Sequence, residues 1–417
     1  MSNPVIVVHY HELWLKGGNR RFFLGKLHTA LKQSLQGIPV ERIEQPGDRY
    51  LVRLGADAPL EEAIKRVERV SGVAYYAVAR PVSRTMDDLC AAAWDEIEQL
   101  RFGSFAVRAK RSDKTFPQST MEIEKAVGRS LLDKLRAAGR EVRVQLKEPD
   151  VTCHIEVTPG PLLVYARKIP GMGGLPANTA GRITCLLSGG YDSAVAAYHM
   201  MKRGAHLSFV HFYGTGARPG ESSLHVASGL TRVLTPYQFW AKLYRVPFEA
   251  IQREIVCAAP EGVRILLYRR MMLRIAEAFA RRDRALALVT GDSLGQVASQ
   301  TLRNLVAVDA AARMPVFRPL IGTDKVDILA TAKKIGTYDV SSEPFHDCCP
   351  VFMPRTPELY ASPQGLDQAE ANLDIAALVT QGIRGATLER FEFTGGRVEA
   401  TEPQAIAGEG RKRAAIA

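Results

Sequence analysis

The sequence predicts an α/β protein of two or three domains, and three observations support this fold class. Short apolar runs of strand length alternate with longer amphipathic segments over most of the 417 residues. A segment rich in Gly, Pro, Ala and Thr, residues 167–182, separates a basic first part from a second part. Directly after this segment, an apolar strand turns into a helix through a pair of glycines, which is typical of nucleotide-binding α/β units.

The first part is expected to hold two small α/β units, residues 1–58 and 59–167. Apolar periodicity predicts helices at residues 19–35, 60–70, 86–99 and 121–138. Strands are predicted at residues 5–10, 50–54, 75–79, 104–108, 141–146 and 152–157. A third unit is expected at residues 168–390, followed by a tail, residues 391–417, that is partly disordered.

The strand-to-helix turn carries the strongest chemical signal. Its sequence is Leu187-Ser188-Gly189-Gly190-Tyr191-Asp192-Ser193. Backbone N–H groups at a helix start attract anions, the two glycines admit a polyphosphate close to the backbone, and Ser188 and Ser193 add hydroxyl donors. Asp192 would repel phosphates unless Mg²⁺ bridged the two. The alternative is an ordinary glycine turn in which Asp192 or Ser193 caps the helix.

Other nucleotide motifs and compartments are disfavoured. The chain has no G-x-x-x-x-G-K-[ST] loop, and residues 171–176 lack the spacing and preceding strand of a dinucleotide fingerprint. No apolar stretch reaches membrane-spanning length, and the N-terminus does not read as a signal peptide. Six scattered cysteines do not form a disulfide framework, so a cytoplasmic protein with reduced thiols is expected.

The charge distribution points to a polyanionic partner. The net charge is +11, and residues 101–147 hold twelve Lys or Arg against five Asp or Glu, while residues 11–32 hold five against one. Phe102, Phe105 and Phe116 are interleaved with these cations, as expected where a module follows a phosphate backbone. RNA is the expected partner, and the alternative is a basic face that is merely solvated.

Several segments together resemble one family. They are residues 10–20, 105–111, 117–123, 173–176, 290–300, 318–325 and 334–338. In the same order, these segments are similar to those of tRNA 4-thiouridine synthetases, the ATP-dependent tRNA sulfurtransferases. The resemblance covers about four-fifths of the chain. It implies a ferredoxin-like domain, a THUMP RNA-binding domain and a doubly wound parallel-sheet pyrophosphatase-loop domain of the adenine nucleotide α-hydrolase type.

The resemblance also implies functional residues. The nucleotide and pyrophosphate site would comprise Leu186, Leu187, Ser188, Gly189, Gly190, Ser193, His211, Phe212, Arg269, Gly291 and Gln300. Cys348, Asp192 and Lys325 would act in catalysis, with Asp192 holding Mg²⁺. The candidate RNA contacts are Lys16, Arg20, Arg108, Lys110, Arg111 and Lys114.

The implied reaction adenylates O4 of uridine 8 in tRNA with ATP and then replaces AMP by sulfur. Sulfur would come as a persulfide from a cysteine desulfurase or a sulfur carrier, and Cys348, adjacent to Cys349, would carry or resolve it. The 68 residues after Cys349 hold no cysteine and are too few for a rhodanese domain, which also puts a role in thiamine thiazole synthesis in doubt. A homodimer is expected. Two alternatives stay open: another adenylating RNA-modifying enzyme, of the 2-thiolation or lysidine type, and a non-catalytic RNA-binding protein.

Overall fold

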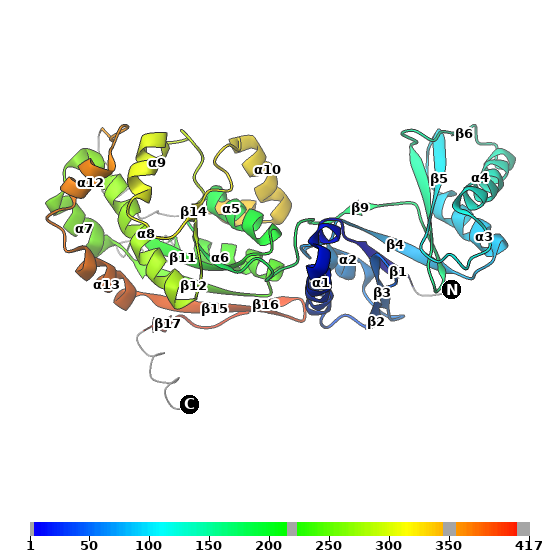
Figure 1. The fold of residues 1–417 in the computed structure, drawn as a ribbon, viewed down its shortest axis with the longest axis horizontal. Helices are drawn as coiled ribbons and strands as arrows, with labels where there is room; N and C mark the ends of the chain where they lie inside the picture. Colours follow the sequence, from blue (N-terminus) through cyan, green and yellow to red (C-terminus); the bar gives the residue numbers. More distant parts are fainter. Residues whose placement is uncertain (1–3, 215–222, 345–355, 407–417) are drawn as a thin grey trace, which may run out of the picture. The chain divides into compact units, whose positions relative to one another are not determined.

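The computed structural model describes residues 4–214, 223–344 and 356–406. The chain divides into two compact units, Met1–Pro176 and Ala177–Ala417 (Figure 1). Each unit has its own β-sheet and its own hydrophobic core. The break between the units falls within the predicted linker, residues 167–182.

The first unit is built on a continuous sheet with strand order β2-β3-β1-β4-β8-β7-β5-β6, and β9 pairs with β4. The strands are β1 (Val5–His9), β2 (Val40–Glu44), β3 (Arg49–Leu54), β4 (Tyr75–Val82), β5 (Ser104–Arg111), β6 (Arg143–Val144), β7 (Val151–Val157), β8 (Leu162–Tyr165) and β9 (Ile169–Pro170). Of the strand predicted at residues 141–146, only the two residues of β6 pair, in parallel with the start of β5.

The helices of this unit start where local sequence signals predict. They are η1 (Glu12–Asn19), α1 (Arg20–Ser34), α2 (Leu60–Glu68), α3 (Met86–Ile97) and α4 (Thr120–Ala137). Ser119 and Glu122 form a capping box at the start of α4, which fixes its first turn. Ile123, Val127 and Leu131 then recur every four residues and bury one face of α4 in the core.

Strand β4 joins the two halves of the first unit. Its first half pairs antiparallel with β1, and its second half, residues 80–82, pairs with β8. Helix α2 packs on α1. Pairing of β1 with β4 joins residues on both sides of the limit expected at residue 58 in one sheet.

A buried polar cluster lies where these halves meet. Oε1 of Glu156, on β7, lies 2.8 Å from Nε2 of His9 and accepts a 2.6 Å hydrogen bond from the Tyr165 hydroxyl. The other oxygen of Glu156 pairs with Arg49, whose side chain is fully buried. Burial alone would raise the pKa of Glu156, but His9 and Arg49 outweigh it and lower the pKa to about 2. Strands β1, β3, β7 and β8 are thus joined by one charged group.

The second unit has a mostly parallel sheet with strand order β14-β13-β10-β11-β12-β15-β16, and β17 pairs with β15. The strands are β10 (Arg182–Leu186), β11 (His206–Tyr213), β12 (Trp240–Pro247), β13 (Leu288–Val289), β14 (Val316–Phe317), β15 (Thr387–Thr394), β16 (Arg397–Ala400) and β17 (Gln404–Ala405). The five strands from β14 to β12 are parallel, while β15 runs antiparallel to β12.

Two groups of helices accompany this sheet (Figure 1). The first group contains α5 (Tyr191–Lys202), α6 (Leu224–Leu234), α10 (Lys325–Ile335) and α11 (Tyr338–Ser342). The second contains α7 (Glu249–Ala258), α8 (Arg264–Arg282), α9 (Leu302–Asp309), α12 (Pro363–Ala369) and α13 (Ile375–Gly385), with the short helices η2 (Thr235–Tyr237), η3 (Glu261–Val263) and η4 (Ala298–Gln300) in the connections. This confirms the predicted doubly wound α/β fold.

The sheet continues into the region expected to be a tail. Strand β15 crosses residue 390, the expected domain boundary, and pairs along its length with β12. Phe391 and Phe393 on β15 are buried. Residues 391–406 therefore belong to the second unit, because alternating apolar residues let this segment continue the sheet.

Candidate active site

The nucleotide-binding region of a doubly wound sheet lies where the strand order reverses. From β10 the chain proceeds to β11 and β12 on one side, and then returns to place β13 on the other side. The loops that leave β10 and β13 therefore open a crevice between them at the carboxyl ends of the strands. Both predicted nucleotide segments, residues 186–193 and 290–300, follow these two strands.

The first of these segments is the turn at the start of α5. We call it the serine-fastened turn, because hydrogen bonds between Ser188 and Ser193 hold it together. Gly190 is the residue that precedes the helix, with an extended conformation and no side-chain cap. The Ser193 hydroxyl accepts a 3.0 Å hydrogen bond from the Ser188 N–H and lies 3.1 Å from the Ser188 hydroxyl. The turn is thus tied to the first turn of the helix, where backbone N–H groups form an anion site.

Asp192 does not cap this helix, so the alternative of an ordinary glycine turn capped by Asp192 does not apply. Its two carboxylate oxygens lie 2.6 and 2.9 Å from Nζ of Lys325, the first residue of α10. Gln296 donates a further hydrogen bond of 3.3 Å to Asp192. A lysine in the first turn of a helix faces the positive end of the helix dipole, which disfavours it there. Its place beside Asp192 indicates a role in the site rather than in helix stability.

Gly291 touches the start of α5 directly. A Cβ atom at this position would lie 2.6 Å from the backbone N of Ser193 and 2.7 Å from the carbonyl carbon of Asp192. No side chain fits at such distances, so the position requires glycine. The predicted role of Gly291 in the nucleotide site thus has a packing basis: it lets the loop after β13 lie against the loop after β10.

Asp292 is the central residue of the site, and sequence reasoning missed it. One of its oxygens accepts a 2.6 Å hydrogen bond from Arg269 and a 3.1 Å hydrogen bond from Gln300. The other accepts a 2.8 Å bond from the Thr290 hydroxyl and a 3.0 Å bond from Arg318. Two predicted nucleotide residues, from α8 and η4, therefore meet on one carboxylate. The available signal was an acid directly after Gly291, at the end of a strand.

This carboxylate is charged despite its burial. Burial alone would raise the pKa of Asp292, but Arg269, Thr290 and Arg318 outweigh it and lower the pKa. Arg318 is held in turn by Asp309, through hydrogen bonds of 2.5 and 2.7 Å. The arginines are consequently fixed in place before any ligand is present.

A cavity of 530 Å³ opens at this crevice, a volume suited to a nucleotide. Several predicted residues line it: Leu186, Ser188, Asp192, Ser193, Arg269, Gly291 and Gln300. Thr290, Asp292, Ser299 and Arg318 line it as well, and Ile265, Leu266 and Met272 on α8 with Val297 provide an apolar wall. The remaining predicted nucleotide residues are Leu187, Gly189, Gly190, His211 and Phe212, none of which lines this cavity in the described part of the chain.

His211 and Phe212 support the site from behind. The Nδ1 atom of His211 lies 2.8 Å from the carbonyl oxygen of Leu187, and its Nε2 lies 2.7 Å from the Ser223 hydroxyl. Phe212 packs edge-on against Phe248 in the hydrophobic core. In this structure His211 holds the start of the loop through Leu187, and Phe212 is a core residue.

The candidate sulfur-carrying residues, Cys348 and Cys349, lie outside the described residues. Among the described cysteines, Cys185 is fully buried under the loop as a core residue, and burial raises its pKa to about 12. Cys153 is also buried, and its pKa is raised to about 12 by the same cause. Neither is therefore a nucleophile at neutral pH.

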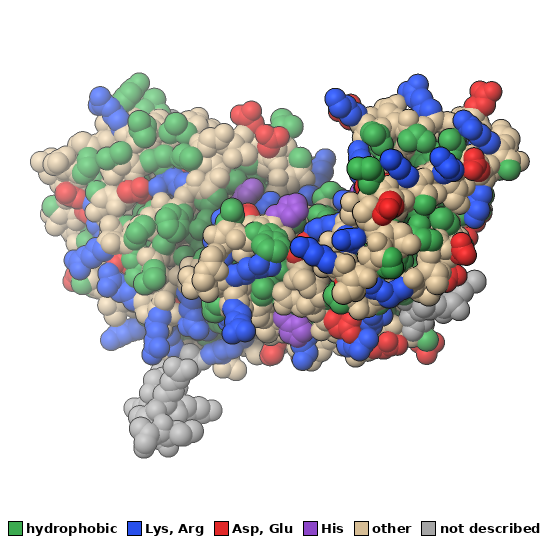
Figure 2. All heavy atoms as spheres, turned by 45° about the vertical axis from the view of Figure 1, so that its right-hand side comes forward, with side chains coloured by type: hydrophobic (Ala, Val, Ile, Leu, Met, Phe, Trp, Pro, Cys, Tyr) green, Lys and Arg blue, Asp and Glu red, His purple; other side chains and the backbone are tan. Residues whose placement is uncertain are grey.

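The candidate RNA contacts occupy two stretches of the first unit. Arg108, Lys110 and Arg111 lie on β5, and Lys114 lies in the loop that follows. Lys110 pairs with Asp48, and Arg111 donates to the carbonyl oxygen of Gln118 at 2.8 Å. Lys114 and Arg108 are exposed. On the face drawn in Figure 2, Lys and Arg side chains lie among uncharged and hydrophobic surface.

The aromatic residues between these cations are not RNA contacts. Phe105 is fully buried, and Phe116 is 3% exposed in the core beneath α4. Phe102 is partly buried and is covered by the guanidinium of Arg140, 4.6 Å from the ring centroid. The interleaving of aromatic residues with cations therefore reflects core packing for Phe105 and Phe116.

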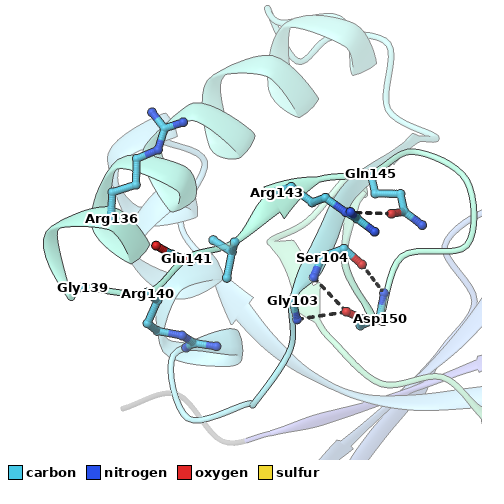
Figure 3. Close-up of a pocket in the computed structure, with 10 residues that line it drawn as sticks. Gly103, Ser104, Arg136, Gly139, Arg140, Glu141, Arg143, Gln145 and Asp150 are labelled. Carbon is cyan, nitrogen blue, oxygen red and sulfur yellow. Dashed lines mark hydrogen bonds between the residues drawn. The ribbon is translucent and has the colours of Figure 1, made fainter.

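A second cavity, of 880 Å³, lies in the first unit between the end of α4 and the start of β5 (Figure 3). Asp150 accepts hydrogen bonds of 2.9 and 2.8 Å from the N–H groups of Gly103 and Ser104. Arg143 lies beside Gln145, and Arg136 extends away from Asp150 at the end of α4 (Figure 3). Both carboxylates and arginines line this cavity, so its lining is neither purely acidic nor purely basic.

The described residues hold neither a metal-type cluster of side chains nor a membrane-spanning helix. Within residues 4–214, 223–344 and 356–406, no three His, Cys, Asp or Glu residues come together as a metal site would require. Across the same ranges, every helix is too short or too polar to span a bilayer.

Three family models match the chain. A ferredoxin-like domain model of the ThiI proteins matches residues 5–77, a THUMP domain model matches residues 83–166, and the model described as thiamine biosynthesis protein (ThiI) matches residues 178–375. A solved structure of a 4-thiouridine synthetase in complex with RNA and bound ATP aligns with a TM-score of 0.82 at 29% identity, covering 96% of this chain and 100% of that chain. A structure from Pyrococcus horikoshii, 22% identical over 80% of this chain and 99% of its own with a TM-score of 0.60, shares the fold.

Curated relatives extend over nearly the whole chain. A probable tRNA sulfurtransferase of Thermus thermophilus is 42% identical, covering 95% of this chain and 96% of its own. A probable tRNA sulfurtransferase of Macrococcus caseolyticus is 36% identical, covering 92% and 94%. The order of domains, the pyrophosphatase-type loop and the extent of these matches agree. The chain therefore belongs to the tRNA sulfurtransferase family, whose members include the 4-thiouridine synthetases.

Proposed function

We propose that this protein is an ATP-dependent tRNA sulfurtransferase that converts uridine 8 of tRNA to 4-thiouridine. The observation that carries the proposal is the cavity at the strand-order reversal, where an anion-binding turn faces Arg269 and Asp292. The same chain carries a THUMP domain, which fits an RNA substrate. The likeness to a 4-thiouridine synthetase solved with RNA and ATP supports both halves.

In the first step, O4 of the uridine attacks the α-phosphate of ATP, and pyrophosphate leaves. The serine-fastened turn at the start of α5 offers backbone N–H groups to the departing pyrophosphate. Lys325 adds a positive charge at the same place, 2.6 Å from Asp192. The Arg269 side chain lies on the cavity wall, is 18% exposed and is paired with Asp292. Its guanidinium is therefore fixed in place before ATP binds.

The residues around the loop fit a Mg²⁺ ion that takes few protein ligands. Asp192 is the carboxylate beside the turn, and Mg²⁺ is usually held by one or two carboxylates together with substrate phosphates and water. Bound with ATP, the ion neutralises charge on the pyrophosphate leaving group. Asp192 would hold it, while Lys325 balances the same carboxylate when the ion is absent. Chelation with EDTA should stop pyrophosphate release, and added MgCl₂ should restore it.

In the second step, sulfur replaces AMP at C4. The outer sulfur of a Cys348 persulfide attacks C4, AMP departs with the electrons of the C4–O bond, and a C4–S–S–Cys348 linkage forms. A second thiol then attacks the Cys348 sulfur, which releases the thiocarbonyl of 4-thiouridine and leaves a disulfide for a cellular dithiol to reduce. A cysteine desulfurase, directly or through a sulfur carrier, supplies the persulfide.

The decisive experiment is nucleoside mass spectrometry after reaction in vitro. Unmodified tRNA is incubated with the protein, ATP, MgCl₂, cysteine and a cysteine desulfurase, and 4-thiouridine is expected only when all are present. A tRNA with cytidine at position 8 is the matched control. Formation of 2-thiouridine instead, or of lysidine in a parallel reaction supplied with lysine, would replace the proposal by one of the other adenylating activities. Binding of tRNA with no modified nucleoside would favour the non-catalytic alternative.

The choice between the two adjacent cysteines is tested separately. We expect Cys348→Ser to abolish 4-thiouridine formation while leaving ATP-dependent pyrophosphate release intact, because adenylation does not need the thiol. Cys349→Ser should retain thiolation and is the matched control. Loss of thiolation only in Cys349→Ser would show that the assignment of Cys348 is wrong.

We also propose that the protein works in the cytoplasm, where its tRNA substrate is, and as a homodimer. Both are properties expected from the family resemblance. Light scattering coupled to size-exclusion chromatography gives the molar mass, for which a value near twice 45.8 kDa is expected. A mass near 45.8 kDa with and without tRNA would refute the dimer.

A further inference from the structure

An exposed surface of aromatic and cationic side chains lies near the N-terminus of the first unit. It consists of Trp14, Lys16, Arg20, Phe22 and Lys26, and we refer to it as the Trp14 surface. Trp14 on η1 is 48% exposed, and Phe22 on α1 is 52% exposed. A contiguous exposed apolar patch that is rimmed by polar residues marks an interaction site more often than a single exposed side chain does.

The indole of Trp14 has two neighbours in the described structure, Arg20 and Tyr10. The guanidinium carbon of Arg20 lies 3.5 Å from the centroid of the Trp14 ring, which is a stacked cation–π contact. The Tyr10 ring centroid lies 6.1 Å from that of Trp14, and Arg20 donates a 3.4 Å hydrogen bond to the hydroxyl of this buried tyrosine. Trp14 is therefore anchored to the core beneath it, and the residue as a whole is still 48% exposed.

In the described part of the chain, no ion pair joins a carboxylate to the cations of this surface. Among residues 4–214, 223–344 and 356–406, no Asp or Glu forms an ion pair with Lys16, Arg20 or Lys26, nor with the adjacent Arg21. Instead, Nζ of Lys16 lies 5.1 Å from the Phe23 ring, and Nζ of Lys26 lies 5.7 Å from the Phe22 ring. The surface thus offers several unbalanced positive charges next to an open aromatic ring.

These properties favour a nucleic acid over a protein as the occupant. Lysines are depleted at protein interfaces, whereas single-stranded nucleic-acid sites combine unpaired cations for phosphates with aromatic rings for bases. A base stacks on an indole or a guanidinium plane, and both are present here in one stack. Paired bases in an A-form duplex do not expose their faces, so the ligand must be an unpaired nucleotide.

We propose that Trp14 is a stacking platform for an unpaired nucleotide of the RNA substrate, with Arg20 supporting the indole and Lys16 and Lys26 contacting the neighbouring phosphates. The inference rests on the proposed function only in taking tRNA as that substrate. It assigns a base contact to the ferredoxin-like half of the first unit, separate from the cations of β5.

Stacking and phosphate contacts have different signatures. Trp14→Ala should weaken tRNA binding roughly 5- to 150-fold at constant salt, the range of one base–aromatic stack, and leave the salt dependence unchanged. Lys26→Gln should lower the slope of log affinity against log salt by about one. Trp14→Phe keeps a smaller ring and should bind with intermediate affinity, which guards against loss of folding as the cause.

The direct test is tryptophan fluorescence of the full chain. The chain has three tryptophans, and Trp240 in the second unit, 38% exposed, is the matched control. Titration with tRNA should quench the parent and Trp240→Phe proteins, while Trp14→Phe should lose that quenching. A blunt RNA duplex should bind without quenching Trp14, because its bases are already stacked.

Three results would overturn the proposal: unchanged affinity in Trp14→Ala, quenching that persists in Trp14→Phe, or Trp14 emission that depends on protein concentration without RNA. The last would identify the surface as a protein interface. The proposed function fails separately. If the parent protein forms no 4-thiouridine, the enzymatic proposal is wrong even where tRNA quenches the fluorescence. If Trp14→Ala forms 4-thiouridine at saturating tRNA and binds tRNA with unchanged affinity, only the stacking proposal is wrong.

Discussion

Replacing Gly291 by alanine should uncouple ATP cleavage from RNA binding. The added Cβ would lie 2.6 Å from the backbone N of Ser193 and 2.8 Å from its Cα, both atoms of the first turn of α5. Ordinary contacts between such atoms are about 3.5–4.0 Å, so the loop and the helix must separate by about 1 Å. A displacement of this size in a catalytic site costs roughly 100-fold in rate. The strain itself costs about 1–3 kcal/mol, or roughly 2–12 °C in melting temperature.

The assay is pyrophosphate release with saturating tRNA, measured beside tRNA affinity and thermal melting. Gly322→Ala is the matched control, because a Cβ at Gly322 has no atom within 4 Å and its backbone is unstrained. We expect Gly322→Ala to behave as the parent, and Gly291→Ala to lose catalysis with tRNA affinity retained. If Gly291→Ala released pyrophosphate at the parental rate, the close approach of the two loops would not be a requirement of the site.

Two further predictions separate stability from catalysis. Glu156→Gln removes one of the two carboxylates paired with the buried Arg49 and leaves the other, Asp48, so the free energy of unfolding in urea should fall by about 1.5–3 kcal/mol at pH 7. Because the folded protein lowers the pKa of Glu156 from 4.5 to about 2, the stabilisation exists above the unfolded value, and the difference between parent and variant should vanish as pH falls through about 2. Lys325→Ala breaks an ion pair whose lysine is 44% exposed, so stability should change by less than about 1 kcal/mol, whereas pyrophosphate release should fall about 100- to 1,000-fold. Melting that drops in step with activity would contradict the catalytic role of Lys325.

Sequence patterns predicted the elements of the fold better than its domain limits. Helix α4 and strand β7 lie within a few residues of their predicted bounds, because amphipathic period and apolar run length are local properties. The limits expected at residues 58 and 391 depend on non-local pairing. Strands β4 and β15 are assigned to their sheets by partners far away in sequence, β1 and β12, and no local signal reports such pairing.

The candidate site shows the same division. Ser188 and Ser193 were predicted from motif chemistry and Gly291 from the family resemblance, and the structure brings the three together around one helix start. Asp292 was missed because its importance comes from Arg269, 23 residues before it, and Arg318, 26 residues after it. Conversely, Phe105 satisfied the pattern of a nucleic-acid contact and is core, since sequence shows neighbours along the chain and not the direction of a side chain.

The cations at the candidate nucleotide site are paired with carboxylates of the same chain. This pairing explains how the cations are held in place without a bound phosphate. A guanidinium as shielded as that of Arg269 would be costly to hold without a partner, because desolvation is not repaid. Asp292 pairs with Arg269, and Asp192 pairs with Lys325, so each carboxylate offsets the desolvation cost of its cation. A ligand must therefore offer these cations more than a carboxylate does. A triphosphate carries more negative charge than a single phosphate and can compete better with the two carboxylates. We therefore expect the site to favour a polyphosphate over AMP, which would help product release after sulfur transfer.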